Sequence, residues 1–233
     1  MENRSINIFK FLVAILLFFN IGKILSILFN ILNININTFD FIDIAYTEVL
    51  ISLVLFIVIF FIYKKTLLDD WFEFKINFKK NLKTCFRLFI VLFIVKLIAS
   101  VIIYILSSIL GINILVSENQ SIINLLLSSA PIMMFISAVL LAPFVEEIIF
   151  RLGLKKIIKD PGLFILLSGL IFGFMHIFPT DINITVALIQ SISYVSIGTL
   201  LAYFYVKYKN IYYVIIIHLL NNLLGVLAAL LLI

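Results

Sequence analysis

The stretch APFVEEIIFR, residues 142–151, decides the fold. It lies inside a long apolar run, and yet it carries two adjacent carboxylates, Glu146 and Glu147, and the guanidinium of Arg151. Charged side chains within a membrane are rare, and they face the interior of a helix bundle or a hydrated cavity. The stretch therefore predicts a membrane helix whose charged residues have a specific role.

The composition of the whole chain places this stretch in a membrane protein. Of 233 residues, 64% are hydrophobic and only 12% are charged, which leaves too little polar surface for a water-soluble globule. The apolar residues are continuous instead of alternating, so the pattern predicts an all-α, polytopic bundle and not a β-barrel. We expect one membrane domain, in which residues 1–130 supply N-terminal helices and an amphipathic cytoplasmic segment, and residues 131–233 carry the polar motifs.

Seven apolar runs are near the roughly 20 residues that a membrane-spanning helix needs, although the fifth is short. Their approximate bounds are 6–32, 44–63, 85–110, 131–158, 163–178, 184–206 and 211–233. Fifteen of the 17 Lys and Arg residues lie at the start of the chain or around alternate connections, and the connections 33–43, 111–130 and 179–183 contain none. Because basic residues stay on the cytoplasmic side, we predict a cytoplasmic N-terminus and a C-terminus outside.

Two parts of the N-terminal half carry further charge. The segment 64–87 mixes lysines with aromatic residues, so we expect an amphipathic element that lies along the cytoplasmic headgroups and binds membrane lipid. Lys96 lies deep in the third run and is expected to face the bundle interior in a structural pairing.

The basic residues of the whole chain form no single stripe, so nucleic acid is not an expected partner. No feature of the sequence indicates an oligomeric state.

Helical geometry separates the two glutamates. Adjacent residues of an α-helix point about 100° apart, whereas residues four apart share a face. We therefore predict that Glu147 and Arg151 form an ion pair that neutralises both. Glu146 then faces elsewhere without a local partner, and a carboxylate in that position suits a general acid or base.

Two histidines and an asparagine are predicted to lie near the depth of Glu146. The sequence DPG at residues 160–162 ends one helix and begins the next, and Glu146 and His176 are each 14 residues from this turn. An antiparallel hairpin would bring both to one level, roughly 21 Å from the turn. His218 and Asn222, four residues apart, share a face of the last run. Singly, such residues are more often structural, but together they favour a functional site in the cytoplasmic half of the bundle.

Three motifs occur in order on successive runs, namely Glu146-Glu147-x-x-x-Arg151, Phe172-x-x-x-His176 and His218-x-x-x-Asn222. In this order they resemble the CPBP family, which comprises CAAX proteases and bacteriocin-processing or self-immunity proteins. The resemblance covers residues 131–233, which would then be the catalytic helix core, and the first three runs carry no family signature. Family members often have Gly directly after the motif arginine. This chain has Leu152 and then Gly153, a departure that concerns helix packing.

The resemblance implies an intramembrane endopeptidase of the cell membrane, with its site in a cavity open towards the cytoplasm. Glu146 would activate the attacking water with help from His176. His218 and Asn222 would stabilise the oxyanion of the tetrahedral intermediate, and the predicted ion pair would hold the motif helix in place. The substrate would be a peptide or a lipid-modified protein, cut near the cytoplasmic membrane face.

The sequence leaves alternatives open. Glu146, His176 and His218 could also hold a catalytic zinc ion. A metal-free glutamate mechanism is favoured, because no His-Glu-x-x-His motif is present and Asn222 suits an oxyanion better than a metal. The alternative function is a non-catalytic bacteriocin self-immunity protein. A transporter would also carry acids in mid-membrane, but the sequence has no inverted repeats or matching broken helices.

Overall fold

The computed structural model describes residues 3–112, 118–177 and 183–231, and within these ranges it contains helices and no strand. Six helical segments are long and apolar enough to cross a membrane, and a shorter apolar helix, α8 (Pro161–Met175), accompanies them. The predicted all-α, polytopic membrane bundle is therefore confirmed. The six segments are α1 (Arg4–Ile31), α2 (Phe41–Ile76), α3 (Phe78–Ile109), the run Pro131–Ile157, α9 (Ile184–Tyr208) and α10 (Ile211–Leu230).

The N-terminal half differs from the prediction in two places. Only Asn77 separates α2 from α3, so the segment 64–87 is not a separate element but forms the ends of two long helices. Leu67 and Phe74 of this segment pack in the core, while its lysines are exposed; its binding of membrane lipid stays a prediction. The helix α4 (Glu118–Ser129) occupies a connection predicted as a loop, and it is held there by its buried Leu126 and Leu127.

The other boundaries agree with the apolar runs within a few residues. The connection 33–43 contains a single short 3₁₀-helix, η1 (Ile36–Thr38). The count of seven is reached only with α8, which has 15 residues and is shorter than the roughly 20 that a full span requires. The predicted ends at residues 178 and 233, and most of the predicted loop 179–183, lie outside the described residues.

The run Pro131–Ile157 is one continuous helix that contains two π-helical segments. A π-helical turn closes its hydrogen bonds one residue further along the chain than an α-helical turn, and such turns are frequent at functional sites. Glu146 and Glu147 end the short α-helical piece between the two π-helical segments. The pieces are α5 (Pro131–Met134), η2 (Phe135–Leu141), α6 (Ala142–Glu147), η3 (Ile148–Gly153) and α7 (Leu154–Ile157), of which η2 and η3 are π-helical.

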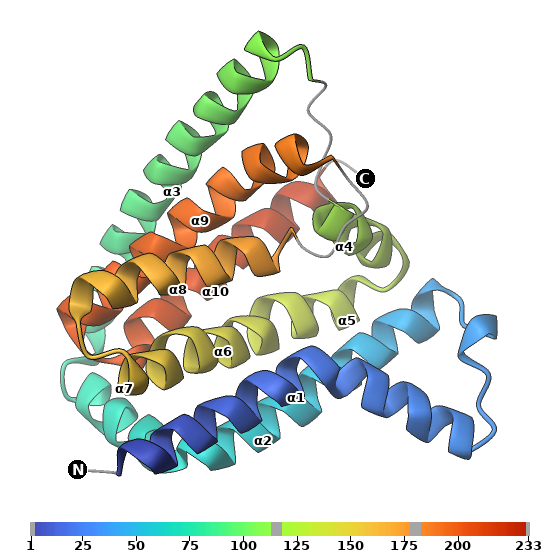
Figure 1. The fold of residues 1–233 in the computed structure, drawn as a ribbon, viewed down its shortest axis with the longest axis horizontal. Helices are drawn as coiled ribbons and strands as arrows, with labels where there is room; N and C mark the ends of the chain where they lie inside the picture. Colours follow the sequence, from blue (N-terminus) through green and yellow to red (C-terminus); the bar gives the residue numbers. More distant parts are fainter. Residues whose placement is uncertain (1–2, 113–117, 178–182, 232–233) are drawn as a thin grey trace.

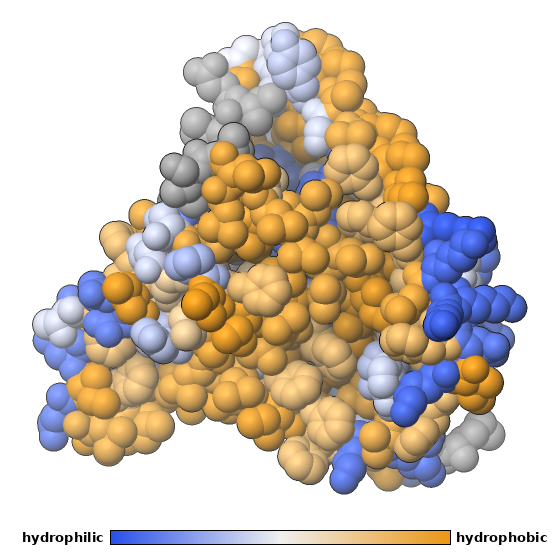
Figure 2. Space-filling view, turned by 180° about the vertical axis from the view of Figure 1, so that it is seen from behind, coloured by the Kyte–Doolittle hydropathy of each residue, from blue (hydrophilic) through white to orange (hydrophobic). Residues whose placement is uncertain are grey.

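The basic connections gather at one end of the molecule. In Figure 1 the α2–α3 junction, the α7–α8 turn and the α9–α10 turn lie on the left, as does the start of α1, whereas α4 and the end of α10 lie away from them. Figure 2 shows a hydrophilic patch at the same end, beside a broad apolar surface. We name the end that carries the basic connections the lysine-rich end, and the end that carries η1 and α4 the lysine-poor end. A wide apolar surface between such ends is the arrangement of a multi-pass membrane protein.

The helices α8 and α9 pack closely through glycines. A Cβ atom at Gly173 would lie 2.7 Å from the backbone nitrogen of Val195, and one at Gly169 would lie 2.9 Å from that of Thr199. Small residues permit such close approach between membrane helices. The contact holds the C-terminal end of α8, and the His176 that follows it, against α9.

Candidate active site

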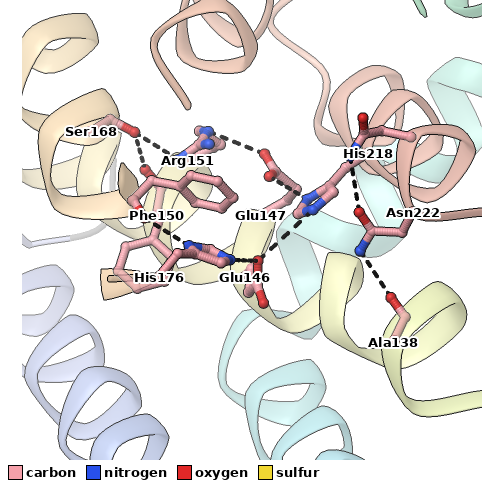
Figure 3. A network of polar contacts seen from close by, with 11 residues as sticks. Ala138, Glu146, Glu147, Phe150, Arg151, Ser168, His176, His218 and Asn222 are labelled. Carbon is pink, nitrogen blue, oxygen red and sulfur yellow. Dashed lines mark hydrogen bonds and ion pairs between the residues drawn. The ribbon is translucent and has the colours of Figure 1, made fainter. Parts of the chain in front are cut away.

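Glu146, His176 and His218 converge from three elements, as predicted from the sequence (Figure 3). Glu146 lies on α6, His176 follows the last residue of α8, and His218 lies on α10. The Nε2 atom of each histidine is 3.9 Å from Glu146 Oε2. This carboxylate oxygen is buried and has no hydrogen bond within the described residues. It therefore faces a gap between two imidazole rings.

Each imidazole ring is held through its other nitrogen. His176 Nδ1 lies 2.8 Å from the carbonyl oxygen of Phe172, and His218 Nδ1 lies 2.9 Å from Glu147 Oε1. A carbonyl or carboxylate oxygen only accepts hydrogen bonds, so Nδ1 of each ring carries a proton. Nε2 of each ring is then directed at Glu146, as an acceptor in the neutral ring and as a donor in the imidazolium. Tyr194 stacks on His176 with 4.8 Å between ring centroids.

Glu147 is shared between an arginine and a histidine. Its Oε2 lies 3.1 Å from Arg151 Nε, and both side chains are fully buried, so the predicted ion pair is confirmed. Its Oε1 accepts from His218, a contact that the spacing along one helix could not predict. Arg151 also donates to Ser168 Oγ at 2.9 Å and lies over the ring of Phe172. Glu147 thus positions a histidine of the site as well as the motif helix.

Ser168 belongs to this network but was not among the residues predicted from the sequence. Its buried hydroxyl accepts from Arg151 and donates to the carbonyl oxygen of Phe150 at 2.8 Å. A lone serine in an apolar run gives little signal. Its spacing could have identified it, because Ser168, Phe172 and His176 are four residues apart and share one face of α8.

Asn222 lies at the same cavity, with its amide partly engaged. Its Nδ2 donates to the carbonyl oxygen of Ala138 in η2 at 2.9 Å. Its Oδ1 accepts from Asn221 Nδ2 at 3.1 Å. A side-chain amide carries two hydrogens, so one N–H of Asn222 remains for a ligand in the cavity.

A cavity of about 680 Å³ connects these residues. Glu146, His176, His218 and Asn222 line it, and its volume is in the range of roughly 300–1,000 Å³ that is usual for ligand sites. The other lining residues include members of α1, α2, α3 and α4, so the N-terminal half completes the site. The cavity extends from the two histidines towards the lysine-poor end. We expected the cavity to open towards the cytoplasm, which the topology prediction places at the lysine-rich end. At that end, apolar residues of the core fill the bundle.

The cluster offers the donor types of a zinc site without its geometry. Two ligands of a tetrahedral zinc ion at usual bond lengths lie about 3.3 Å apart, whereas Glu146 Oε2 is 3.9 Å from each Nε2 atom. Among the described residues, no three His, Cys, Asp or Glu side chains are arranged to hold a metal ion. The side chains as placed therefore do not fit zinc.

The segment that carries this network matches a known family. The family model for type II CAAX prenyl endopeptidase Rce1-like proteins matches residues 128–224. These residues are therefore similar to the Rce1-like family, and we name them the Rce1-like segment. The Rce1-like segment contains all three motifs and confirms the resemblance that they indicated. It does not include α1, α2 or α3.

The chain is also similar to the UPF0177 protein YvdC of Lactococcus lactis subsp. lactis (strain IL1403). The two are 36% identical over 118 residues, which are 50% of this chain and 42% of YvdC. The chain thus spans less than half the length of this relative. No solved structure matches the chain.

Proposed function

We propose that this chain is an intramembrane endopeptidase of the cell membrane, in which Glu146 activates the water that hydrolyses a peptide bond. One observation carries the proposal: a buried carboxylate oxygen without a hydrogen bond lies 3.9 Å from two imidazole nitrogens, beside a cavity of about 680 Å³. The match of residues 128–224 to the Rce1-like family model supports the proteolytic class. The substrate would be a peptide or a lipid-modified protein, and membrane lipid would surround the apolar surface.

The geometry suits a bridging water, since a polar separation of 3.9 Å is too long for a direct hydrogen bond and accommodates one water between the groups. Nε2 of neutral His176 would orient this water by accepting one of its hydrogens. Glu146 would take the other proton as the water oxygen attacks the scissile carbonyl carbon, and would then give a proton to the leaving amine. The C–N bond breaks in that second step.

The carbonyl oxygen of the scissile bond would accept hydrogen bonds from two donors on the side opposite the attacking water. The remaining N–H of Asn222 is one of them. His218 would donate from Nε2 as an imidazolium, and Glu147 on its Nδ1 would stabilise the charge of that ring, as a carboxylate does in hydrolase triads. Fixed donors at the position of the developing oxyanion account for much of the rate enhancement in acyl transfer.

Replacement of Glu146 by Gln tests the proposal. We expect loss of cleavage by on the order of 10²–10⁴-fold, because the amide cannot take the proton of water. Glu73→Gln is the matched control, because this carboxylate is exposed near the end of α2. Membrane-peptide termini would be compared in cells that carry the wild-type chain or either variant. A cleavage that disappears only with Glu146→Gln supports the proposal, whereas an unchanged set of termini contradicts it.

We propose further that the reaction needs no metal. The 3.9 Å separations of the three donor groups, wider than those of about 3.3 Å around zinc, support this view. The purified protein should keep full activity after exhaustive chelation and contain no stoichiometric metal. Activity that is lost on chelation and restored by zinc would show that the metal mechanism is correct.

A further inference from the structure

The cavity lies on one side of the proposed catalytic residues along the axis of the bundle. On α10 it begins at His218, in the half of the helix nearer the lysine-rich end, and continues to Val226 near the other end. On the motif helix it continues from Glu146 back to Met134. On α2 it reaches Glu48, close to the lysine-poor start of that helix. Three helices thus indicate the same direction, away from the lysine-rich end.

Between Glu146 and the lysine-rich end, the helices are closely packed. Ile148, Phe150 and Leu152 follow the acidic pair towards the lysine-rich end, and all three are fully buried. Ile211 and Val214 at the start of α10 are buried in the same hydrophobic cluster. Close-packed interiors leave few voids larger than a water molecule. This packing obstructs the direction of the lysine-rich end, and the cavity offers water and substrate a route to Glu146.

The lining of the cavity suits a peptide. Polar side chains stand on several of its walls, including Glu48, Lys96, Gln120 and Asn221. Groups of this kind among apolar residues orient a ligand by hydrogen bonds, and a peptide backbone offers one donor and one acceptor per residue. Figure 2 shows hydrophilic atoms at the floor of a hollow below the lysine-poor end of α3.

The distribution of basic residues assigns the two ends to the two sides of the membrane. The lysine-rich end is cytoplasmic by the positive-inside rule, so the lysine-poor end is extracytoplasmic. We infer that the cavity receives peptide segments from the extracytoplasmic side, and that the substrates are peptides which are exported from the cell or reach it from outside. This inference rests on the proposed function, and it replaces the expected cleavage near the cytoplasmic face.

Thiol accessibility in oriented vesicles tests the direction of entry. The chain has a single cysteine, Cys85, which Cys85→Ala removes. In that background Ser100→Cys places a thiol on the cavity wall, and Lys79→Cys places one on the exposed lysine-rich end. A membrane-impermeant charged maleimide should modify Cys at position 100 at least about tenfold faster in right-side-out vesicles than in inverted ones. Position 79 should show the reverse order.

The outcomes separate the inference from the proposed function. Faster modification of position 100 in inverted vesicles, equal rates, or no modification in either would overturn the direction of entry. The cleavage abolished by Glu146→Gln is measured independently. If position 100 reacts from outside while no cleavage depends on Glu146, the function fails and the direction stands. Modification of position 100 by a bulky maleimide in right-side-out vesicles should also slow the Glu146-dependent cleavage.

Discussion

Two adjacent glutamates have different surroundings in this protein. Glu147 Oε2 lies 3.1 Å from Arg151 Nε in an ion pair, and its Oε1 accepts from His218, whereas Glu146 Oε2 lies 3.9 Å from the nearest nitrogen of either histidine. A buried ion pair adds little net stability, but removal of one partner leaves an uncompensated charge in a medium of low dielectric constant. The same substitution should therefore affect the two positions differently.

Glu147→Gln is expected to lower the free energy of unfolding by about 3–5 kcal/mol, because Arg151 stays buried without its counterion. Glu146→Gln should change it by less than about 1 kcal/mol. Equilibrium unfolding in mixed micelles measures both values. The double variant Glu147→Gln/Arg151→Met should recover part of the loss. If the double variant is as unstable as Glu147→Gln alone, the unpaired arginine is not the cause.

Ser168→Ala is expected to lower the free energy of unfolding by about 1–3 kcal/mol. The change leaves an arginine N–H and the carbonyl oxygen of Phe150 without this buried partner, and such groups then carry their full desolvation penalty. Ser191→Ala is the matched control, because within the described part of the chain the buried hydroxyl of Ser191 bonds only to the carbonyl of Leu188 in its own helix. Equal effects of the two substitutions would contradict a special role for Ser168.

At the scale of elements, the glycine contacts between α8 and α9 place His176. Gly173→Ala should separate the two helices, since the new Cβ would lie 2.7 Å from the backbone nitrogen of Val195. We expect a loss of about 1–3 kcal/mol in the free energy of unfolding, together with slower cleavage as His176 moves relative to Glu146. Gly22→Ala on α1 is the control, because a Cβ there would lie 3.9 Å from the side chain of Ile51, an ordinary van der Waals contact. Unfolding and cleavage assays on both variants check the expectation.

The order and approximate bounds of the helices could be predicted because a membrane requires long apolar runs, and the chain follows that requirement closely. The ion pair of Glu147 with Arg151 could be predicted from spacing alone, since it lies within one helix. Its bond to His218 could not, because the rotation of α10 against α6 depends on packing. The π-helical segments and the direction of the cavity also depend on how the helices meet, which local sequence patterns do not contain.

At the scale of the whole molecule, the site belongs to both halves of the chain. The Rce1-like segment, residues 128–224, carries the proposed catalytic residues. Phe18, Ser52 and Lys96 from the first three helices line the same cavity. Lys96 also lies 3.5 Å from Asn221 Oδ1, in line with the inward orientation expected for it. The N-terminal helices therefore form part of the wall of the cavity in which the substrate is proposed to bind.

Division of the chain between residues 130 and 131 tests this dependence. We expect residues 131–233 alone to be inactive, because α1, α2 and α3 are missing from the cavity wall. Co-expression with residues 1–130 should restore cleavage, and the two pieces should purify together. Copurification and cleavage assays measure the two effects. Full activity of residues 131–233 alone would show that the N-terminal helices are dispensable.

The two π-helical segments of the motif helix also bear on the history of the chain. Each π-helical turn accommodates one residue more than an α-helical turn. We therefore regard η2 and η3 as single-residue insertions that left the faces of the helix on either side in register. Relatives that lack such an insertion should be shorter by single residues within 135–141 or 148–153, and not in the connections, where length usually varies. An alignment of Rce1-like sequences would test this, and the acidic pair should remain between the two positions where length changes.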